Sequence, residues 1–302
     1  MTLINSLCET VLTNEPMKRF TSFKIGGPAD FILFPKTTNE LINIRDTCKK
    51  NNLPLTILGD GANVLVSDDG IRGVVVFTNK MNTVEIYGSE RIRAMSGVRL
   101  SALADAACSA SLEGLAFASG IPGTVGGAIA MNAGAYSQTI SDNITQICIY
   151  DCNIGEEIII PKHKAKFEYR SSIFKDKNCI ILWADFEFSM EIKYGVLLAR
   201  QGDFLKKRRT DQPLDCRSCG SVFKNPKGHR AWKLIDDSGL RGFSVGDAQI
   251  SEKHTNFIVN HGNATAEDVR KVIAEVRKTV KDNFNILLEP EVVFLGEFDT
   301  KI

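Results

Sequence analysis

The sequence predicts a mixed α+β protein of about two domains. Stretches with the apolar period of amphipathic helices alternate along the chain with short runs rich in β-branched residues. The 302 residues amount to about two domains at ~150 residues each. A hydrophobic share of 43% is enough to bury a sizeable core, so we expect a folded chain and exclude a disordered polar one.

The first predicted helix begins after Thr37, which is spaced from Glu40 as in a capping box, and it ends at the Asn-Asn pair 51–52. A second, Ala-rich helix is predicted at residues 100–112, with Gly114 closing it. The predicted strands before the last hundred residues are 55–58, 73–77, 91–95, 147–150, 158–160 and 180–188.

The last hundred residues have an αβ pattern of their own. We expect a strand at residues 256–259, a helix capped by Thr265 and a last strand at residues 287–294. Residues 191–213, just before this part, are polar and basic, and we place a domain boundary near their start. The apolar face of the predicted helix consists of Val269, Val272, Ile273, Val276 and Val280.

Two glycine-rich segments lie in the first half of the chain. Residues 59–63 (Gly-Asp-Gly-Ala-Asn) follow a predicted strand, where glycine permits positive φ and lets an anion approach the backbone N–H groups. The third glycine of a dinucleotide fingerprint is missing, so an ordinary β-turn explains this segment better when it is taken alone. Residues 120–127 hold four glycines and a proline, which disfavour a helix or strand and fit a ligand-contacting loop or a buried tight loop. Together the segments suggest a dinucleotide lying between them.

Three polar residues of the second half have both a chemical and a structural interpretation. Arg170 stands among residues that could be buried, and Ser221 follows a glycine. Glu291 lies on an otherwise apolar predicted strand, where an unpaired carboxylate would be costly. Taken one by one, a structural ion pair, a turn hydroxyl and the outward face of a strand are the simpler explanations. No Gly-x-Ser-x-Gly elbow surrounds Ser221.

Eight cysteines are spread over a chain that shows no secretory signal at its N-terminus. Cys216 and Cys219 have the spacing of a redox or metal motif, but no second pair of ligands has zinc spacing. We therefore expect a cytoplasmic protein with reduced, mostly structural thiols and no metal. A disulfide or a metal site at Cys216 and Cys219 is the less favoured alternative.

The charge balance and the apolar pattern limit the class of partner. The 37 basic and 36 acidic residues leave a formal charge of +1, which argues against nucleic acid as the main partner. No run approaches the ~20 apolar residues of a membrane span. We expect no nucleic acid or membrane partner, and no obligate protein partner is visible in the sequence.

Several segments, in order along nearly the whole chain, resemble the UDP-N-acetylenolpyruvoylglucosamine reductases of peptidoglycan synthesis. The three most specific are Tyr-Arg-Ser-Ser-Ile-Phe-Lys at 169–175, Gly-Ser-Val-Phe-Lys-Asn-Pro at 220–226 and Leu-Glu-Pro-Glu-Val at 288–292. The others are residues 14–30, 58–66 and 114–136, and the last of the specific segments extends to residue 296.

The resemblance implies a bipartite FAD-binding domain of the vanillyl-alcohol-oxidase type plus a C-terminal α+β domain for a UDP-sugar. We place FAD-binding subdomain 1 at residues 1–80, FAD-binding subdomain 2 at 81–192 and the substrate-binding domain at 193–302. The resemblance also implies a reaction in which NADPH reduces non-covalently bound FAD. The flavin then passes hydride to UDP-N-acetylglucosamine enolpyruvate, which gives UDP-N-acetylmuramate.

The resemblance assigns roles to individual residues. Arg170, Ser221 and Glu291 match the family's arginine, its proton-donating serine and its essential glutamate. The expected substrate contacts are Tyr169, Arg209, Lys224 and Asn225. The expected FAD contacts are Gly59, Gly61, Ala62, Asn63, Val64, Gly120, Gly123, Thr124, Gly126, Gly127, Asn132, Gly134 and Ala135.

The sequence departs from the family pattern at two points. Ser221 follows Tyr169 too closely to accommodate the tyrosine-bearing substrate loop of longer members, so the chain looks like the compact subtype. Cys219 stands where a small residue precedes the Gly-Ser pair, and we hypothesise that oxidation of this thiol affects activity.

Two other functions would be compatible with the same fold. A flavin-dependent oxidase of a sugar or alcohol would show oxygen-driven turnover or covalently bound flavin. A nucleotide-sugar-binding module without redox function would contain no flavin, and the presence of Arg170, Ser221 and Glu291 argues against it.

Overall fold

The computed structural model describes residues 2–175, 177–188 and 192–298, and the chain divides into two compact units. Unit 1 is formed by Met1–Val11, Ile32–Asp60 and Val75–Lys207. Unit 2 is formed by Leu12–Phe31, Gly61–Val74 and Arg208–Ile302. Each unit is assembled from segments that are far apart in the sequence. The three-part division at residues 80 and 192 therefore stays a prediction.

The regular elements are named in chain order. The α-helices are α1 (Thr2–Asn5), α2 (Thr38–Lys50), α3 (Leu100–Ser109), α4 (Val125–Met131), α5 (Tyr194–Asp211), α6 (Ala231–Asp237) and α7 (Ala266–Phe284). The strands are β1 (Val11–Pro16), β2 (Pro28–Leu33), β3 (Leu55–Leu58), β4 (Val64–Val66), β5 (Ile71–Phe77), β6 (Val84–Tyr87), β7 (Arg91–Met95), β8 (Gly134–Ala135), β9 (Gln138–Thr139), β10 (Ile144–Asp151), β11 (Glu156–Pro161), β12 (Cys179–Glu187), β13 (Ser244–Val245), β14 (Ala248–Ile250), β15 (Ile258–Asn260) and β16 (Val293–Leu295).

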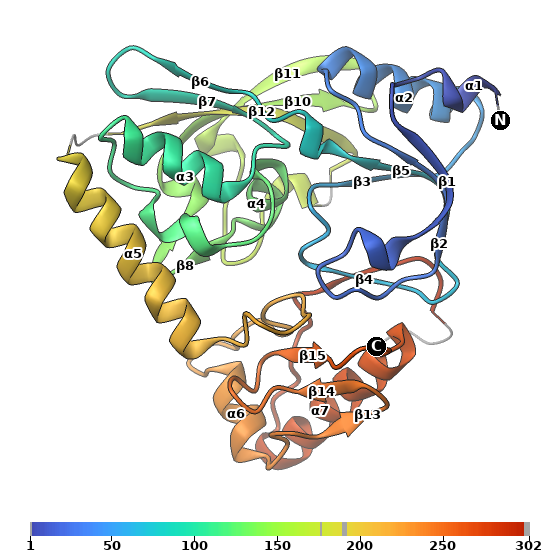
Figure 1. The fold of residues 1–302 in the computed structure, drawn as a ribbon, viewed down its shortest axis with the longest axis vertical. Coiled ribbons are helices and arrows are strands. Elements are labelled where there is room, and N and C mark those ends of the chain that lie inside the picture. Colours follow the sequence, from blue (N-terminus) through green and yellow to red (C-terminus); the bar gives the residue numbers. More distant parts are fainter. Residues whose placement is uncertain (1, 176, 189–191, 299–302) are drawn as a thin grey trace. The chain divides into compact units, whose positions relative to one another are not determined.

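Unit 1 contains an antiparallel five-stranded sheet with the order β11-β10-β12-β7-β6. Helix α4 contacts β7 and β12, and it shares one apolar cluster with α3 and the sheet (Figure 1). Ile92, Ala184 and Phe186 of the sheet are fully buried in this cluster. The strands predicted around residues 91–95, 147–150, 158–160 and 180–188 are confirmed.

A second sheet has the strand order β1-β2-β5-β3, and its strands contribute residues to both units. The strands predicted at residues 55–58 and 73–77 are confirmed as β3 and β5. On unit 1, the rings of Phe34 and Phe77 stack with their centroids 5.5 Å apart. The strands β1 and β2 of this sheet were not predicted from the sequence.

The predicted helix after Thr37 is confirmed as α2. The Thr37 hydroxyl accepts a hydrogen bond from the Glu40 N–H at 3.2 Å, while the Glu40 carboxylate accepts one from the Lys36 N–H at 2.6 Å. Both ends of a capping arrangement are thus present, with the second one residue earlier than in a standard box. The helix ends at Lys50 with Asn51 as its C-cap, so the Asn-Asn pair follows it as predicted, and Asn52 takes the left-handed conformation with φ of 52°.

The Ala-rich helix α3 ends earlier than the sequence suggested. It stops at Ser109, and the residue with left-handed φ that follows it is Ser111 (φ 63°), so Gly114 does not close the helix. The Ser111 and Leu112 N–H groups bind the carbonyls of Cys108 and Ala107, which satisfies the last turn. The prediction of the helix was correct and that of its end was wrong.

The expectation that residues 120–127 avoid helical structure was also wrong. Helix α4 begins at Val125 and runs through Gly126 and Gly127. A Cβ on Gly126 would lie 3.0 Å from the Ser96 Cβ, so glycine is present there for a close approach to the neighbouring segment. Packing outweighs the helix penalty of glycine, which amounts to about 1 kcal/mol per residue.

The polar and basic segment 191–213 contains α5, which the sequence analysis did not predict. Its contacts with the rest of unit 1 come from residues three or four apart: Leu197 is buried, Gln201 donates to Asp105, and Phe204 stacks on Tyr136 at 4.8 Å. This spacing places them on one face of the helix. The helix was not predicted because basic residues dominate the composition of this segment and hide the spacing of the residues on that face.

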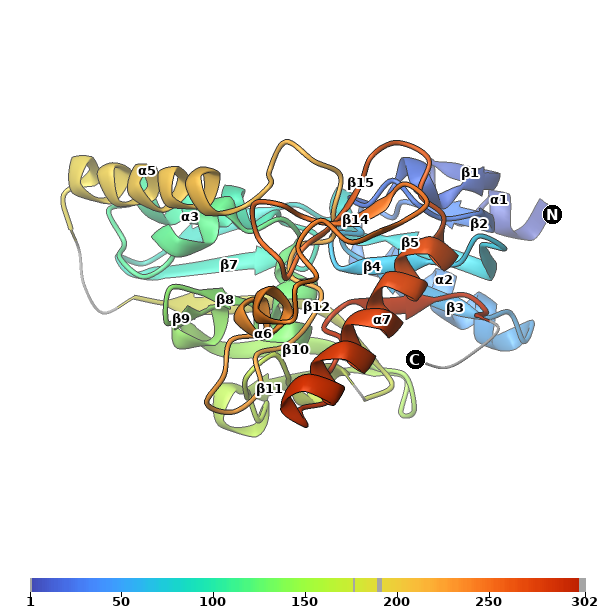
Figure 2. The same ribbon diagram turned by 90° about the horizontal axis from the view of Figure 1, so that it is seen from below.

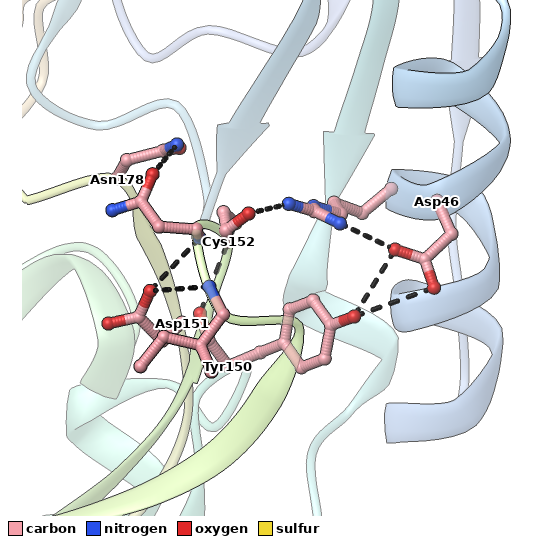
Figure 3. A network of polar contacts seen from close by, with 8 residues as sticks. Asp46, Tyr150, Asp151, Cys152 and Asn178 are labelled. Carbon is pink, nitrogen blue, oxygen red and sulfur yellow. Dashed lines mark hydrogen bonds and ion pairs between the residues drawn. The ribbon is translucent and has the colours of Figure 1, made fainter.

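A polar network fixes α2 to the turn between β10 and β11 (Figure 3). The buried Arg45 guanidinium contacts the Asp46 carboxylate at 2.7 Å and donates to the Cys152 carbonyl. The Tyr150 hydroxyl donates to the same carboxylate at 3.2 Å, and the Arg45 guanidinium lies 5.3 Å from the centre of its ring. A buried charge is tolerated only when it is paired, so this network accounts for an arginine inside the helix–sheet contact.

Unit 2 packs the amphipathic helix α7 against a three-stranded sheet with the order β13-β14-β15 (Figure 2). The predicted cap is confirmed, because the Thr265 hydroxyl accepts from the Asp268 N–H at 3.0 Å. The Asp68 carboxylate, from a distant segment, accepts from the Ala266 and Glu267 N–H groups at 2.9 and 3.1 Å. The five apolar residues predicted for this helix, Val269, Val272, Ile273, Val276 and Val280, are all buried.

The last predicted strand is much shorter than expected. Only residues 293–295 form a strand, β16, which pairs in parallel with β4. Residues 287–292 are not assigned to a strand, and Pro290 within them has no N–H to donate. The strand predicted at residues 256–259 is displaced to β15, two residues later at its start.

Candidate functional site

The two glycine-rich segments meet within unit 1 at Gly59 and Thr124. A Cβ built on Gly59 would lie 2.2 Å from Thr124 Oγ1, so only glycine fits at the end of β3. On the other side of the loop, the Val125 and Gly126 N–H groups bind the carbonyls of Val98 and Ser96 at 2.8 Å. The two segments are thus neighbours in the part that lies in unit 1, while the dinucleotide expected between them stays a prediction.

Three buried side-chain oxygens near this loop have no hydrogen-bond partner within the described part of the chain. They are Ser96 Oγ, Thr124 Oγ1 and Asn132 Oδ1, from residues that are at most 5% exposed. Burying an unpaired polar group is costly, so buried groups of this kind indicate a missing partner such as a ligand. A Cβ on Gly127 would have only Thr124 Oγ1, at 3.8 Å, within 4 Å among the described atoms.

The predicted residues around this loop differ in conformation. Gly120 ends a 3-10 helix (Ala116–Gly120), and Gly123 has φ of 118°, which favours glycine. The carbonyl of Gly123 accepts from the Leu100 N–H at the start of α3. Gly134 and Ala135 form the short strand β8, which pairs with β9.

Arg170 and Tyr169 occupy the tip of a tight hairpin in unit 1. Glu168 and Ser171 exchange N–H···O bonds of 3.0 and 3.3 Å across them, and Arg170 has φ of 55°. The Arg170 guanidinium donates to the Gly134 carbonyl at 2.9 Å and lies 5.3 Å from the centre of the exposed Tyr169 ring.

The same hairpin is fixed to the end of α4. Asn132, with φ of 43°, donates from Nδ2 to the Glu168 carbonyl at 2.9 Å. The Ser172 hydroxyl donates to the Ala130 carbonyl at 2.8 Å. Unit 1 therefore brings the predicted catalytic arginine next to Asn132 and Gly134, two of the predicted FAD contacts.

Ser221 and Glu291 are brought together in unit 2 by an irregular ladder. The Glu291 N–H donates to the Val222 carbonyl at 2.7 Å, and the Lys224 N–H donates to the Glu289 carbonyl at 2.9 Å. On its other edge, Ser221 forms an antiparallel bridge with Phe257. The serine segment thus lies between the glutamate segment and residues 256–257.

Of the predicted substrate residues in unit 2, Lys224 and Asn225 bind other protein groups through their side chains, and Arg209 is exposed. Lys224 Nζ lies 2.6 Å from the Glu289 carboxylate, and its side chain is 16% exposed. Asn225 Oδ1 accepts from the Ala231 N–H at the start of α6, at 2.9 Å. Arg209 is exposed in the last turn of α5, and its carbonyl accepts from Lys253 Nζ at 2.5 Å.

The remaining predicted FAD residues, Gly61, Ala62, Asn63 and Val64, belong to unit 2. Gly61 has φ of 62°, and a Cβ there would lie 2.5 Å from the Phe20 carbonyl. The Ser22 hydroxyl donates to the Ala62 carbonyl at 3.0 Å, and Val64 begins β4.

Asn63 has a role that the sequence analysis did not anticipate. Its side-chain Nδ2 donates to the Glu291 carbonyl at 3.0 Å, and its own carbonyl accepts from the Val293 N–H at 3.0 Å. The contact between Asn63 and Glu291 spans 228 residues, so no local pattern signals it.

All eight cysteines are free thiols, as predicted. Burial raises the pKa of the Cys219 thiol to about 12, and the Glu291 carboxylate adds to the shift. A buried thiol with so high a pKa is unreactive, which argues against the hypothesis that oxidation of Cys219 controls activity. Cys216 is exposed, and no metal-binding cluster of His, Cys, Asp or Glu occurs among the described residues.

The structure also adds residues to the site that sequence reasoning missed. Ser96 contributes one of the unpartnered oxygens beside Gly126, and Asn256 contacts the segment that carries Ser221. Neither lies in a recognisable motif. A buried asparagine and a buried serine are visible as a signal only once the fold shows their burial.

Comparison with known proteins shows the family of the chain. The chain is 45% identical over 289 residues to the UDP-N-acetylenolpyruvoylglucosamine reductase of Clostridium kluyveri, and the match covers 96% of this chain and 94% of the relative. The chain belongs to the UDP-N-acetylenolpyruvoylglucosamine reductase family. The reductase of Caldanaerobacter subterraneus is likewise 45% identical, over 94% of this chain and 93% of that protein.

Domain models and a solved structure extend the match to both parts of the chain. Residues 29–156 match an FAD binding domain, and residues 212–295 match the C-terminal domain of UDP-N-acetylenolpyruvoylglucosamine reductase. The crystal structure of the reductase from Thermus caldophilus is similar with a TM-score of 0.79 at 30% identity, over 95% of this chain and 98% of that one. The predicted α+β fold with an FAD-binding domain and a C-terminal substrate domain is therefore confirmed.

The residues of unit 1 fit the FAD that the family uses. The unpartnered oxygens of Ser96, Thr124 and Asn132 are suited to hydrogen-bond a polar ligand. Gly59 and Gly127 remove side chains that would otherwise occupy the space beside Thr124.

In the described part of the chain, no helix has both the length and the apolar character needed to cross a bilayer.

Proposed function

We propose that this chain uses NADPH and FAD to reduce UDP-N-acetylglucosamine enolpyruvate to UDP-N-acetylmuramate, a step of peptidoglycan precursor synthesis. The observation that carries the proposal is the similarity of nearly the whole chain to reductases of this name. The geometry of Ser221 and Glu291 supports it, because their segments lie on one ladder. The FAD-binding match to residues 29–156 supports the redox part of the reaction.

The chemistry requires one hydride and one proton. FAD held beside Gly59 and Thr124 would supply the hydride chemistry, taking a hydride from NADPH and delivering it to C3 of the enolpyruvyl group. The C2–C3 π pair then moves to C2 and into the adjacent carboxylate, so that an enolate-like charge develops. Protonation at C2 completes the saturated lactyl ether, and NADP⁺ is the oxidised product.

Ser221 is the proposed proton donor to C2. Its Oγ–H bond breaks as the C2–H bond forms, and solvent returns the proton to the alkoxide. A serine hydroxyl is a weak acid, but the enolate-like carbon is a strong base, so the transfer is feasible from a positioned donor. The bridge to Phe257 and the bond from Glu291 to Val222 hold the main chain on both edges of Ser221.

Arg170 and Glu291 are proposed to stabilise the developing charge. A fixed positive charge and aligned donors lower a barrier most when they face charge that forms in the transition state. Arg170 supplies the charge, and the bond from its guanidinium to the Gly134 carbonyl orients it. Glu291 supplies a hydrogen bond when it is protonated in a site that excludes water.

The substrate contacts remain proposals for the same reaction. We assign Tyr169, Lys224 and Asn225 to substrate binding and Arg209 to the diphosphate. Lys224 already pairs with Glu289, so a phosphate there competes with a carboxylate for the same ammonium. The exposure of Arg209 is compatible with binding of a soluble anion.

The proposed setting of the reaction follows from the substrate. Both UDP-sugars and NADPH are small water-soluble molecules, so we propose that the chain works in the cytoplasm. The absence of a nucleic-acid, membrane or obligate protein partner stays a prediction from composition and charge.

Two flavin half-reactions test the proposal directly. NADPH added without oxygen is expected to bleach the flavin absorbance of the purified holoenzyme, and UDP-N-acetylglucosamine enolpyruvate is expected to restore it in stoichiometric amount. UDP-N-acetylglucosamine without the enolpyruvyl group is the control and leaves the flavin bleached. Recovery with oxygen alone, and none with the enolpyruvyl substrate, would instead identify an oxidase.

A further inference from the structure

A buried asparagine lies directly against the segment that carries Ser221. Asn256 is 5% exposed. Its side-chain Oδ1 accepts from the Phe223 N–H at 3.0 Å, and its Nδ2 donates to the Phe223 carbonyl at 2.9 Å. The main-chain carbonyl of Asn256 also accepts from the Val222 N–H at 2.8 Å. One residue thus makes three hydrogen bonds to two consecutive residues after the serine.

The side chain of Asn256 takes the place of a strand partner. The main chain turns at this point, because the Phe257 N–H binds the His254 carbonyl at 2.9 Å. The side-chain amide therefore supplies to Phe223 the donor and the acceptor that a peptide group would otherwise provide. Asparagine and glutamine are the side chains that offer a donor and an acceptor on one neutral amide. Because the N–H and the carbonyl of Phe223 are buried, leaving either one without its hydrogen bond is costly.

The main chain around Ser221 is held on both of its sides. Before it, Cys219 is buried, Arg217 forms a bridge with Asn260, and Gly220 between them and the serine has φ of 85°. The C-terminal side is held at Val222 and Phe223 by Asn256. The opposite edge of the same two residues binds the glutamate segment, through the bond from Glu291 to Val222 and the bridge between Phe223 and Pro290.

We propose that Asn256 is a positioning residue that sets the direction of the Ser221 hydroxyl for proton delivery to C2. The inference rests on the proposed function, in which Ser221 donates that proton. Asn256 itself touches no reacting atom. Displacements of about 1 Å in a catalytic group are enough to cost about a hundredfold in rate, so a shift in the register of this segment has a large kinetic effect.

The test compares the two flavin half-reactions in holoenzyme variants. Asn256→Leu removes both side-chain bonds with little change in size, and Asn256→Asp keeps the acceptor for the Phe223 N–H and loses the donor. We expect flavin reoxidation by the enolpyruvyl substrate to be slowed at least about tenfold, while flavin reduction by NADPH stays within about twofold of the parent enzyme. The solvent deuterium isotope effect on reoxidation is expected to rise, because proton transfer becomes slower than hydride transfer. Asn256→Asp carries the same test if Asn256→Leu does not retain FAD.

A double-mutant comparison separates positioning from general destabilisation. In a Ser221→Ala background, Asn256→Leu is expected to slow reoxidation no further, because the group it positions is gone. Asn260→Leu is the matched control, since Asn260 is also buried in unit 2 and its side chain bonds to Phe23, Gly262 and Ala264. That variant is expected to lose stability without a change in the isotope effect.

The possible outcomes distinguish the two levels of the proposal. Equal slowing by Asn256→Leu with and without the Ser221 hydroxyl, or an unchanged isotope effect, would overturn the positioning role and leave the reaction in place. Normal reoxidation in Ser221→Ala itself would overturn the proposed role of the serine.

Discussion

The glycine loop of unit 1 and the serine ladder of unit 2 are built in opposite ways. Around Gly59 and Thr124 the chain removes side chains and leaves buried oxygens without partners inside the described protein. Around Ser221 the chain adds side-chain amides, and Asn256 and Asn63 complete hydrogen bonds of the main chain. The glycine loop therefore has buried oxygens that can still accept hydrogen bonds from a ligand, whereas the side-chain amides of the serine ladder already bind the main chain.

Under the proposed function, this difference separates a cofactor-binding region from a catalytic region. A cofactor that stays bound can supply the missing partners of the loop permanently, so the protein leaves them open. A proton donor must stay aligned while substrate enters and product leaves, so its main chain needs partners that never depart. We therefore expect changes in the loop to alter cofactor affinity, and changes in the ladder to alter one half-reaction.

The largest effect is expected for Ser221→Ala, which tests the ladder. Loss of a positioned general acid typically costs about 10²–10⁴-fold, so flavin reoxidation by the enolpyruvyl substrate is expected to slow by that factor. Flavin reduction by NADPH is expected to stay within about twofold. Stopped-flow absorbance of the flavin measures both rates, and an equal loss in both would remove the contrast between the two regions.

The next effect is expected for Gly59→Ala, which tests the loop. The added Cβ would lie 2.2 Å from Thr124 Oγ1, on a β-branched side chain that has little freedom to move away. We expect FAD to bind about tenfold more weakly or worse, measured by fluorescence titration of the apoprotein with FAD.

The matched control for this variant is Gly202→Ala in α5, where an added Cβ meets no described atom within 4 Å. It is expected to leave FAD affinity unchanged and to stabilise the helix by about 1 kcal/mol. Normal FAD affinity in Gly59→Ala would show that the fit at Thr124 does not matter for the cofactor.

The smallest effect is expected for acid, through His254 beside the ladder. Burial lowers the pKa of His254 from its usual 6.5, and its Nδ1 accepts from the Asn256 N–H at 3.3 Å. The unfolded chain therefore binds this proton more readily than the folded one. The stabilising contribution of neutral His254 is present above pH 6.5 and is lost as the pH falls through the lower pKa of the folded state.

Urea unfolding between pH 5 and pH 8 measures this effect, with one proton contributing at most about 1.4 kcal/mol per pH unit. His254→Gln is expected to flatten the dependence, whereas the same change at the exposed His229 is expected to leave it as it is. A steeper loss of stability in acid for His254→Gln would contradict the assignment.

Local signals were sufficient for the elements whose causes are local. Thr37 and Thr265 allowed α2 and α7 to be predicted, because an N-cap side chain binds an N–H group only three residues further along the chain. The apolar spacing of α7 predicted its buried face residue by residue. The motif residues Ser221 and Glu291 were likewise found from the sequence through the resemblance, and the structure brings their segments together.

The elements that escaped prediction depend on distant partners. Helix α4 includes Gly126 because Ser96 lies close to it and leaves little space for a side chain, which the sequence of the helix cannot reveal. The contact of Asn63 with Glu291 spans 228 residues, and that of Asn256 with Phe223 spans 33. Composition and spacing report neither, because both are consequences of the tertiary fold.

The parallel pairing of β4 with β16 has a consequence for biosynthesis. Val64 pairs with Val293 and Val66 with Leu295. Strand β4 is therefore synthesised more than two hundred residues before its partner β16. Asp68, next to the early strand, likewise has to wait for the N-terminus of α7. Unit 2 therefore cannot close during most of translation, and its early apolar strand stays without this partner until residues 293–295 have been made. A strand edge that stays unpaired during folding is prone to aggregate.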